Sequence, residues 1–232
     1  MRTEAFTHVG LVRKGNEDSY LVNRDLGLFA VADGMGGHEA GEVASVLAVQ
    51  TLENALIASG NTEGALKAGI QLANSEIYRQ AQENPRFHGM GTTITAVHHS
   101  GGQVYIGHVG DSRAYLIRGG QATLLTRDHS LVNELLLCGQ ITEEEAENHP
   151  QKHIVTRALG TEPSVEVDIL SPVIEHEDKL LLCSDGLSNL IKGEEIAEII
   201  HNHATSPALQ TLKQLALDRG GFDNITALLV EF

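Results

Sequence analysis

The chain has 232 residues, of which 41% are hydrophobic, and this is enough to bury one sizeable core. Its formal net charge of -15 argues against a nucleic acid or an anionic membrane as the main partner, although it fits acids gathered around cations. No apolar run approaches the roughly 18 residues of a membrane span, and the N-terminus lacks the apolar core of a secretion signal. We therefore expect one cytoplasmic domain over residues 1–232.

The two cysteines fit a reducing compartment. Cys138 and Cys183 lie far apart, form no Cys-x-x-Cys pair and have apolar neighbours. We therefore expect both to be reduced, buried thiols.

The beginning of the chain predicts two strands, over residues 7–12 and 19–23, around a polar turn. This turn brings Arg13 close to Glu17 and Asp18. Such an arginine either forms a surface ion pair or binds a phosphate while the carboxylates hold water around a metal.

An apolar run over residues 29–32 predicts a buried strand that ends at Asp33. Gly34 and two further glycines follow, and they allow a sharp turn in which a carbonyl can approach an ion. The stretch is either a tight strand-to-helix turn with an incidental acid or part of a metal site.

Two amphipathic helices are predicted next, over residues 41–59 and 62–83, because apolar side chains recur at helical spacing. The short connection makes them an antiparallel pair that packs against a sheet.

Four β-rich runs follow, over residues 92–98, 103–109, 113–118 and 121–125. The glycine turns between them imply antiparallel pairing. Asp111 follows Gly110 in one of these turns, so this pair is either an ordinary hairpin turn or a second acid of a metal site.

The pattern then weakens around two short helices, over residues 131–137 and 142–147, of which the second begins with a capping box. The weak pattern covers residues 127–168, and a long insertion of this kind in a compact chain is often a functional lid or flap. Three residues of this insertion are candidates for contact with a substrate, namely His149, His153 and Arg157. For the two histidines, the alternative is a solvated position on the surface.

The last part predicts strands over residues 165–170, 178–183 and 225–232, and a helix pair over residues 194–203 and 208–218. Asp185 follows the second of these strands in an Asp-Gly pair, and Asp223 precedes the third.

Four acids therefore stand in turns beside strands, namely Asp33, Asp111, Asp185 and Asp223. If they converge, they would repel one another and raise one another's pKa values, so the arrangement requires bound cations or shared protons. Oxygen ligands without Cys or His at metal spacing favour Mg²⁺ or Mn²⁺. Two such ions would yield a hydroxide near neutral pH that attacks a phosphate oriented by Arg13.

Seven motifs occur in order: Arg13-x-x-Asn16-Glu17-Asp18, Asp33-Gly34-Met35-Gly36-Gly37-His38, Gly91-Thr92-Thr93, Gly110-Asp111-Ser112-Arg113, Asp128-His129-Ser130, Ser184-Asp185-Gly186 and Asp223-Asn224-Ile225-Thr226. Together they resemble the bacterial metal-dependent protein phosphatases of type 2C, the PPM family. The resemblance spans nearly the whole chain. It implies an α+β fold, a four-layer α-β-β-α sandwich of two mostly antiparallel sheets flanked by antiparallel helix pairs. It also implies that residues 139–163 form a mobile flap.

The resemblance also implies a site for two Mn²⁺ or Mg²⁺ ions. Asp33 would bridge both ions, the carbonyl of Gly34 would bind one, and Asp185 with Asp223 would complete the other. Arg13 resembles the phosphate-binding arginine of the family.

Three further acids are implied around these ions. Asp18 and Glu17 would act through metal-bound waters, and Asp111 would share a weaker third ion with Asp185. Some eukaryotic relatives place a histidine directly after the Asp-Gly pair as general acid. This chain has a methionine there, so we assign that role to His38, with metal-bound water as the alternative.

We therefore predict a phosphatase that hydrolyses phosphoserine and phosphothreonine in one step by direct attack of a metal-bridging hydroxide. The chain lacks the Cys-x5-Arg loop of the cysteine-based class, and its charge conflicts with a nuclease. A pseudophosphatase that only binds phosphoproteins would have lost ligand acids, and every expected acid is present. We expect a monomer that acts on phosphorylated proteins, including a Ser/Thr kinase and its substrates.

Overall fold

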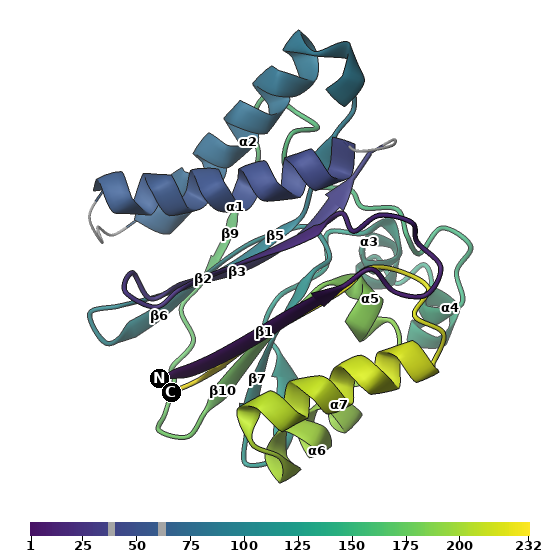
Figure 1. Ribbon diagram of the computed structural model, residues 1–232. Helices are drawn as coiled ribbons and strands as arrows, with labels where there is room; N and C mark the ends of the chain where they lie inside the picture. Colours follow the sequence, from purple (N-terminus) through teal and green to yellow (C-terminus); the bar gives the residue numbers. More distant parts are fainter. Residues whose placement is uncertain (37–39, 60–63) are drawn as a thin grey trace.

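The computed structural model describes residues 1–36, 40–59 and 64–232, and two antiparallel sheets form its centre (Figure 1). The first sheet has the order β1 (Arg2–His8), β11 (Ile225–Glu231), β10 (Lys179–Cys183), β7 (Arg113–Arg118) and β8 (Gln121–Leu124). The second has the order β2 (Asp18–Asn23), β3 (Leu28–Met35), β5 (Ile94–Ser100), β6 (Gln103–Val109) and β9 (Asp168–Leu170), and β4 (Gly91–Thr92) pairs with β3. Every strand pair is antiparallel.

A pair of helices covers the outer face of each sheet. The second sheet carries α1 (Ala40–Ser59) and α2 (Ala65–Glu83), and the first carries α6 (Gly193–Asn202) and α7 (Thr205–Asp218). The predicted four-layer α-β-β-α sandwich is therefore confirmed.

Successive side chains of β3 point alternately into two buried layers, and this explains why the strand is apolar on both faces. Phe29 and Val31 pack between the two sheets, against residues such as Leu228 of β11. Leu28 and Ala30 point the other way, into the layer under α1 and α2. A strand buried on both faces reads as a continuous apolar run, and this is the pattern that the sequence shows.

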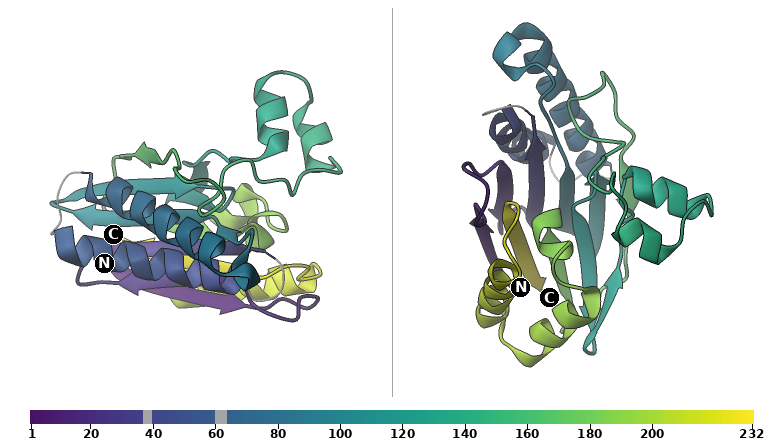
Figure 2. Two further views of the ribbon diagram at one scale, coloured as in Figure 1. Left: turned by 90° about the horizontal axis from the view of Figure 1, so that it is seen from above. Right: turned by 90° about the vertical axis from the view of Figure 1, so that its right-hand side faces the viewer.

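Two short helices stand off one edge of the sandwich (Figure 2). They are α3 (Leu131–Leu137) and α4 (Glu143–Glu147), and the Thr142 capping box that starts α4 is present as predicted. Two further short elements are η1 (Pro85–Phe87) and α5 (Asp185–Ser188). In the part of the chain that the structure describes, no helix has the length and apolar character needed to cross a bilayer.

Several local predictions were wrong. Residues 9–17 form a loop rather than the end of a strand: Leu11 donates its N–H to the Gly221 carbonyl at 2.7 Å, and its side chain is 64% exposed. Thr93 interrupts the predicted strand 92–98, because its N–H and hydroxyl bind the backbone of Asp33.

Three more corrections concern the second half of the chain. The predicted strand 165–170 is ordered as a strand only over Asp168–Leu170, where it pairs with β6. Asp185 begins the short helix α5 instead of a plain turn. Cys183 is buried as expected, but Cys138 is exposed because it lies at the end of α3, away from the sandwich. The predicted helix start at residues 62–63 lies outside the described residues.

Candidate active site

Acidic side chains from both sheets meet at one end of the sandwich. Asp18 on β2 and Asp33 on β3 are direct neighbours in the strand register. Asp185 follows β10, and Asp223 precedes β11. The charges of Asp18, Asp185, Asp111 and Asp223 all act on the carboxyl group of Asp33. The convergence that the sequence predicts therefore occurs.

Asp18 is the most deeply buried of these acids, with 6% of its surface exposed. The Ser184 hydroxyl donates to its Oδ2 at 2.8 Å, whereas its buried Oδ1 has no hydrogen-bond partner. Burial raises the pKa of Asp18 to about 7, although hydrogen bonding by the Thr226 and Ser184 side chains opposes this change. Oδ1 is thus a desolvated carboxylate oxygen without a donor.

Asp33 is held by backbone contacts on β3. Its N–H donates to Thr93 Oγ1 at 3.0 Å, and its carbonyl accepts from Thr93 N–H and Thr92 Oγ1, both at 2.9 Å. Burial and the neighbouring acids, Asp18 first among them, raise the pKa of its carboxyl group well above the usual range. These hydrogen bonds fix the backbone of Asp33 and leave its carboxyl group to face the other acids.

Gly34 allows the backbone around Asp33 to pack closely. A Cβ at this position would lie 2.1 Å from the Gly41 carbonyl oxygen and 2.5 Å from that of Glu17. Gly34 itself continues β3 and pairs with Thr92, so the predicted passage from strand to helix comes after Met35 and before α1 begins at Ala40. Glycine is needed here because β3 lies against the start of α1.

Glu17 lies at the same junction. Its N–H donates to Asn224 Oδ1 at 2.7 Å, and its carbonyl accepts from Ser45 Oγ at 2.6 Å. A Cβ on Gly41 would approach its Oε2 to 2.4 Å, so the carboxylate lies against the first turn of α1. Burial raises the pKa of Glu17, and Arg13 opposes this change.

Asp111 follows Gly110 in the turn between β6 and β7. Gly110 has a φ of +110°, and a Cβ there would lie 2.5 Å from Thr93, so only glycine fits. Burial, followed by the charges of Asp185 and Asp128, raises the pKa of Asp111 to about 7. Asp111 therefore belongs to the same electrostatic cluster.

Asp185 and Asp223 complete the cluster from the first sheet. Burial and the charge of Asp223 raise the pKa of Asp185, and Asn189 donates to its Oδ2 at 3.0 Å. Arg13 Nη2 donates to Asp223 Oδ2 at 2.8 Å, and the Arg13 side chain is 55% exposed. The guanidinium therefore stands at the mouth of the cluster.

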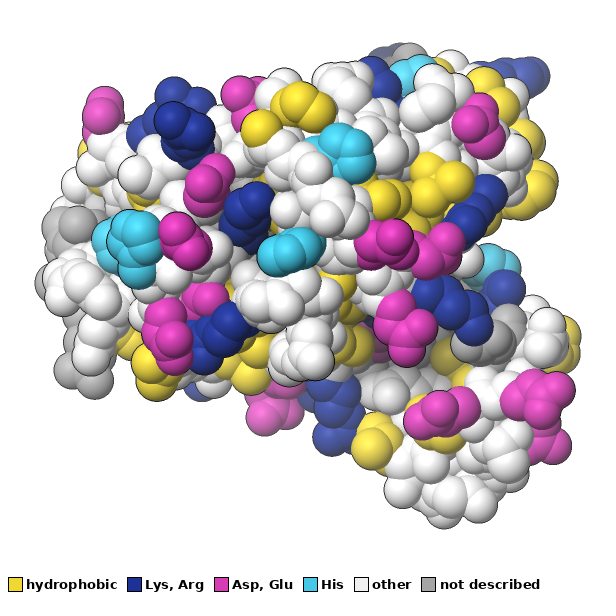
Figure 3. All heavy atoms as spheres, turned by 90° about the horizontal axis from the view of Figure 1, so that it is seen from below, with side chains coloured by type: hydrophobic (Ala, Val, Ile, Leu, Met, Phe, Trp, Pro, Cys, Tyr) yellow, Lys and Arg dark blue, Asp and Glu magenta, His cyan; other side chains and the backbone are white. Residues whose placement is uncertain are grey.

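A pocket of about 780 Å³ is lined by Asp111 and Asp185 of the cluster and by residues of α3 and α4. Asp111 and Asp185 line one end, Leu136 and Glu143 of α3 and α4 line one side, and Lys192 lies before α6. Figure 3 shows α3 and α4 as a lobe apart from the body, with charged side chains of both signs where the two meet. The pocket therefore reaches the Asp111 and Asp185 side of the acid cluster.

The flap candidates have different positions. Arg157, near the end of the predicted flap, pairs with Asp168 Oδ1 at 2.8 Å and is not among the residues that line the pocket. His149 accepts the N–H of Gln151 within a local turn. His153 is exposed but lies close enough to Asp185 to lower the pKa of that acid against the larger effect of burial.

His38 lies outside the described residues. Within residues 1–36, 40–59 and 64–232, no three carboxylate, His or Cys side chains lie close enough together to enclose one ion as they stand. The structure adds supporting residues to which the sequence assigned no role, namely Ser45, Thr92, Thr93, Ser184 and Asn224. Four of these residues, all but Ser45, lie inside the motifs quoted above. Their place in the motifs is the feature of the sequence that could have identified them.

Comparison with known proteins identifies the family. The family model for protein phosphatase 2C matches residues 13–219. This chain belongs to the protein phosphatase 2C family. It is 44% identical to the serine/threonine phosphatase stp of Listeria monocytogenes, with 100% of this chain and 96% of that protein covered.

Solved structures of the family agree with this assignment. The serine/threonine phosphatase PstP/Ppp of Mycobacterium tuberculosis has a TM-score of 0.90 and 39% identity over 100% of this chain and 98% of that chain. A structure of the PstP catalytic domain in complex with two manganese ions has a TM-score of 0.89 and 39% identity, with 98% and 96% covered. The predictions of the family and of a protein phosphatase enzyme are confirmed.

Proposed function

We propose that this protein phosphatase hydrolyses phosphoserine and phosphothreonine in proteins and depends on Mn²⁺ or Mg²⁺. The observation that carries the proposal is the gathering of acids from both sheets whose pKa values are raised by burial and by one another, Asp33 most of all. Such a cluster costs free energy unless cations or protons neutralise it. The full-length similarity to a serine/threonine phosphatase supports the substrate class.

The donor set fits hard divalent ions. The acids supply carboxylate oxygens, and the buried Oδ1 of Asp18 has no protein donor. Gly34 has no Cβ to fill the narrow space between β3 and α1. Oxygen ligands of this kind suit Mg²⁺ and Mn²⁺, and the related PstP domain was solved with two manganese ions.

We assign the ion ligands as the sequence predicts. Asp33, the Gly34 carbonyl, Asp185 and Asp223 would hold two ions, and Asp18 and Glu17 would support them through water. Asp111 with Asp185 would hold a weaker third ion. When bound, such ions lower the pKa of water so that hydroxide forms near neutral pH.

Arg13 would bind the phosphate group of the substrate. Its guanidinium is already at the acid cluster through Asp223, and a planar fork of N–H donors matches phosphate oxygens. Ser184 and Thr93 would keep Asp18 and Asp33 in place. The assignment of His38 as general acid stays a prediction.

We expect phosphorylated proteins as substrates, and a Ser/Thr kinase among them. The pocket beside the flap has room for residues that flank the phosphorylated side chain. A monomer and a cytoplasmic location stay predictions.

Hydrolysis of para-nitrophenyl phosphate and of a phosphothreonine peptide tests the proposal. Activity should require Mn²⁺ or Mg²⁺, disappear on chelation and be abolished in Asp33→Asn and Asp185→Asn. Asp25→Asn is the matched control, because Asp25 is exposed in the turn after β2. Equal activity after exhaustive chelation would refute metal dependence.

A further inference from the structure

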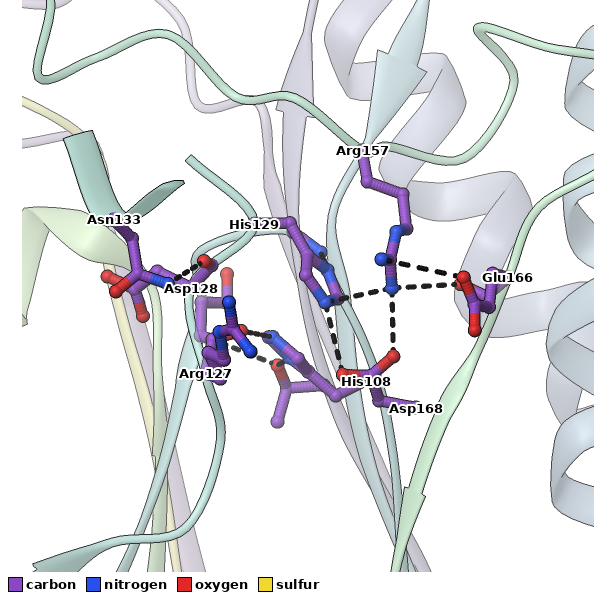
Figure 4. A network of polar contacts seen from close by, with 11 residues as sticks. His108, Arg127, Asp128, His129, Asn133, Arg157, Glu166 and Asp168 are labelled. Atoms are coloured by element: carbon purple, nitrogen blue, oxygen red, sulfur yellow. Dashed lines mark hydrogen bonds and ion pairs between the residues drawn. The ribbon is translucent and has the colours of Figure 1, made fainter. Parts of the chain in front are cut away.

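A chain of polar contacts links the segment around Arg157 to the turn that carries Asp111. Figure 4 shows the part of it that His129, Asp168 and Arg157 form. His129 stands at its centre, in the segment before α3. The backbone N–H of His129 donates to the Gly110 carbonyl at 2.8 Å, and the Gly110 N–H donates to His129 Nδ1 at 3.0 Å. One residue therefore satisfies both backbone polar groups of Gly110.

The contacts of the ring determine its tautomer. Because Nδ1 accepts the Gly110 N–H, a neutral imidazole carries its proton on Nε2. Nε2 lies 3.2 Å from Asp168 Oδ2 and donates to it. The ring is 7% exposed, and burial, assisted by the charge of Arg157, lowers the pKa of His129, which favours the neutral form.

Arg157 closes the network on the flap side. Its Nη1 donates to Asp168 Oδ1 at 2.8 Å, so Asp168 joins Arg157 to the His129 ring (Figure 4). Nη1 also lies 2.9 Å from His129 Nε2, but both nitrogens carry protons, so this contact is not a hydrogen bond. The backbone adds to this attachment: Thr156 N–H donates to the His129 carbonyl at 2.8 Å, and an antiparallel bridge joins Ser130 to Val155. The segment that returns from the flap is therefore joined to the residue that holds Gly110.

The opposite side of the turn is anchored to the sheet. Thr95 Oγ1 donates to the Ser112 carbonyl at 2.8 Å, and the hydroxyl groups of Thr93 and Ser112 are 2.8 Å apart. Asp111 lies between this sheet anchor and the His129 anchor. Both neighbours of Asp111 in the chain, Gly110 and Ser112, are therefore held by hydrogen bonds.

We propose that His129 is a positioning residue, which with Asp168 and Arg157 attaches the Gly110–Asp111 turn to the base of the flap and so directs Asp111 into the acid cluster. Its role rests on the proposed function, in which Asp111 is an ion ligand. The proposal adds a requirement beyond the ligand acids themselves. The Gly110–Asp111 turn must be attached to the base of the flap for Asp111 to bind an ion.

Amide hydrogen exchange in the metal-free protein tests the anchor without any use of activity. His129→Leu removes the acceptor, so exchange at the Gly110 N–H should speed up by about tenfold relative to a core amide such as that of Leu228. His129→Asn places an amide oxygen where Nδ1 was, so exchange at Gly110 should stay near the wild-type rate. Equal acceleration at Gly110 and Leu228 would show a global loss of stability and overturn the proposal.

Asp178→Asn is the matched control. Asp178 is a buried carboxylate held by Arg118 through Nε at 2.9 Å, at a site that has no contact with Gly110 among the interactions of the described residues. This variant should leave the ratio of Gly110 to Leu228 exchange unchanged. Nitrogen chemical shifts of His129 should also show the proton on Nε2, and a proton on Nδ1 would contradict the anchor.

A double-mutant cycle tests whether His129 acts through Asp111. His129→Leu should lower kcat in the wild type, and in the Asp111→Asn background it should cause no further loss. Additive losses would overturn the positioning role. Absence of metal-dependent activity in the wild type would instead refute the proposed function, and the exchange measurement would still decide whether the anchor exists.

Discussion

Replacement of Asp18 by asparagine should stabilise the protein when divalent ions are absent. Burial raises the pKa of Asp18 from its ordinary 3.8 to about 7, so the folded protein disfavours the charged form. A folded pKa above the unfolded value favours folding most below pH 4, and this contribution is lost as the pH rises through 7. Asparagine keeps the shape and an acceptor for Ser184 but never becomes charged.

The expected size follows from the pKa difference. A change of about three pKa units corresponds to about 4 kcal/mol at pH 8. For a protein of this size, that free energy raises the midpoint of thermal unfolding by about 10 °C. At pH 4 the advantage should fall below about 1 kcal/mol, because Asp18 is protonated in the folded state and only about half ionised in the unfolded chain there.

Urea unfolding in chelator at pH 4, 6 and 8 measures this difference. Excess Mn²⁺ should reverse the order at pH 8, because an ion that binds only the folded wild type stabilises it. The exposed Asp25→Asn serves as control and should behave like the wild type. If the Asp18→Asn advantage is absent at pH 8, or is the same at pH 4, the burial of an uncompensated charge at Asp18 is refuted.

Arg13→Ala should raise KM for para-nitrophenyl phosphate more than it lowers kcat, because phosphate affinity suffers first; an unchanged KM would exclude phosphate binding by Arg13. Asp111→Asn should weaken activity and change the metal titration, and a wild-type titration would contradict an ion at Asp111. Gly34→Ala should destabilise the metal-free protein by about 3 kcal/mol, since its Cβ would lie 2.1 Å from the Gly41 carbonyl oxygen. Gly15→Ala, whose Cβ would meet nothing within 4 Å, is the control, and equal unfolding midpoints for the two would show that β3 can move away from α1.

Local patterns in the sequence were sufficient to predict much of the fold. The strands Gln103–Val109 and Arg113–Arg118 and the helix Leu131–Leu137 occur with the predicted bounds. Alternation and helical spacing report which faces are buried, and glycine turns separate the strands. The same patterns failed at residues 9–12, which form a loop in which Leu11 and Val12 lie exposed.

The sequence by itself also determined the family and the candidate acids, because the motifs are short and their order is specific. Tertiary structure decided the partners of each acid. Ser184 binds Asp18 from 166 positions away, and Asn224 binds Glu17 from 207 positions away. The network of His129, Asp168 and Arg157 under the flap was likewise invisible in the sequence. Periodicity records burial along one element, whereas these contacts depend on strand register and on how two sheets and a flap pack together.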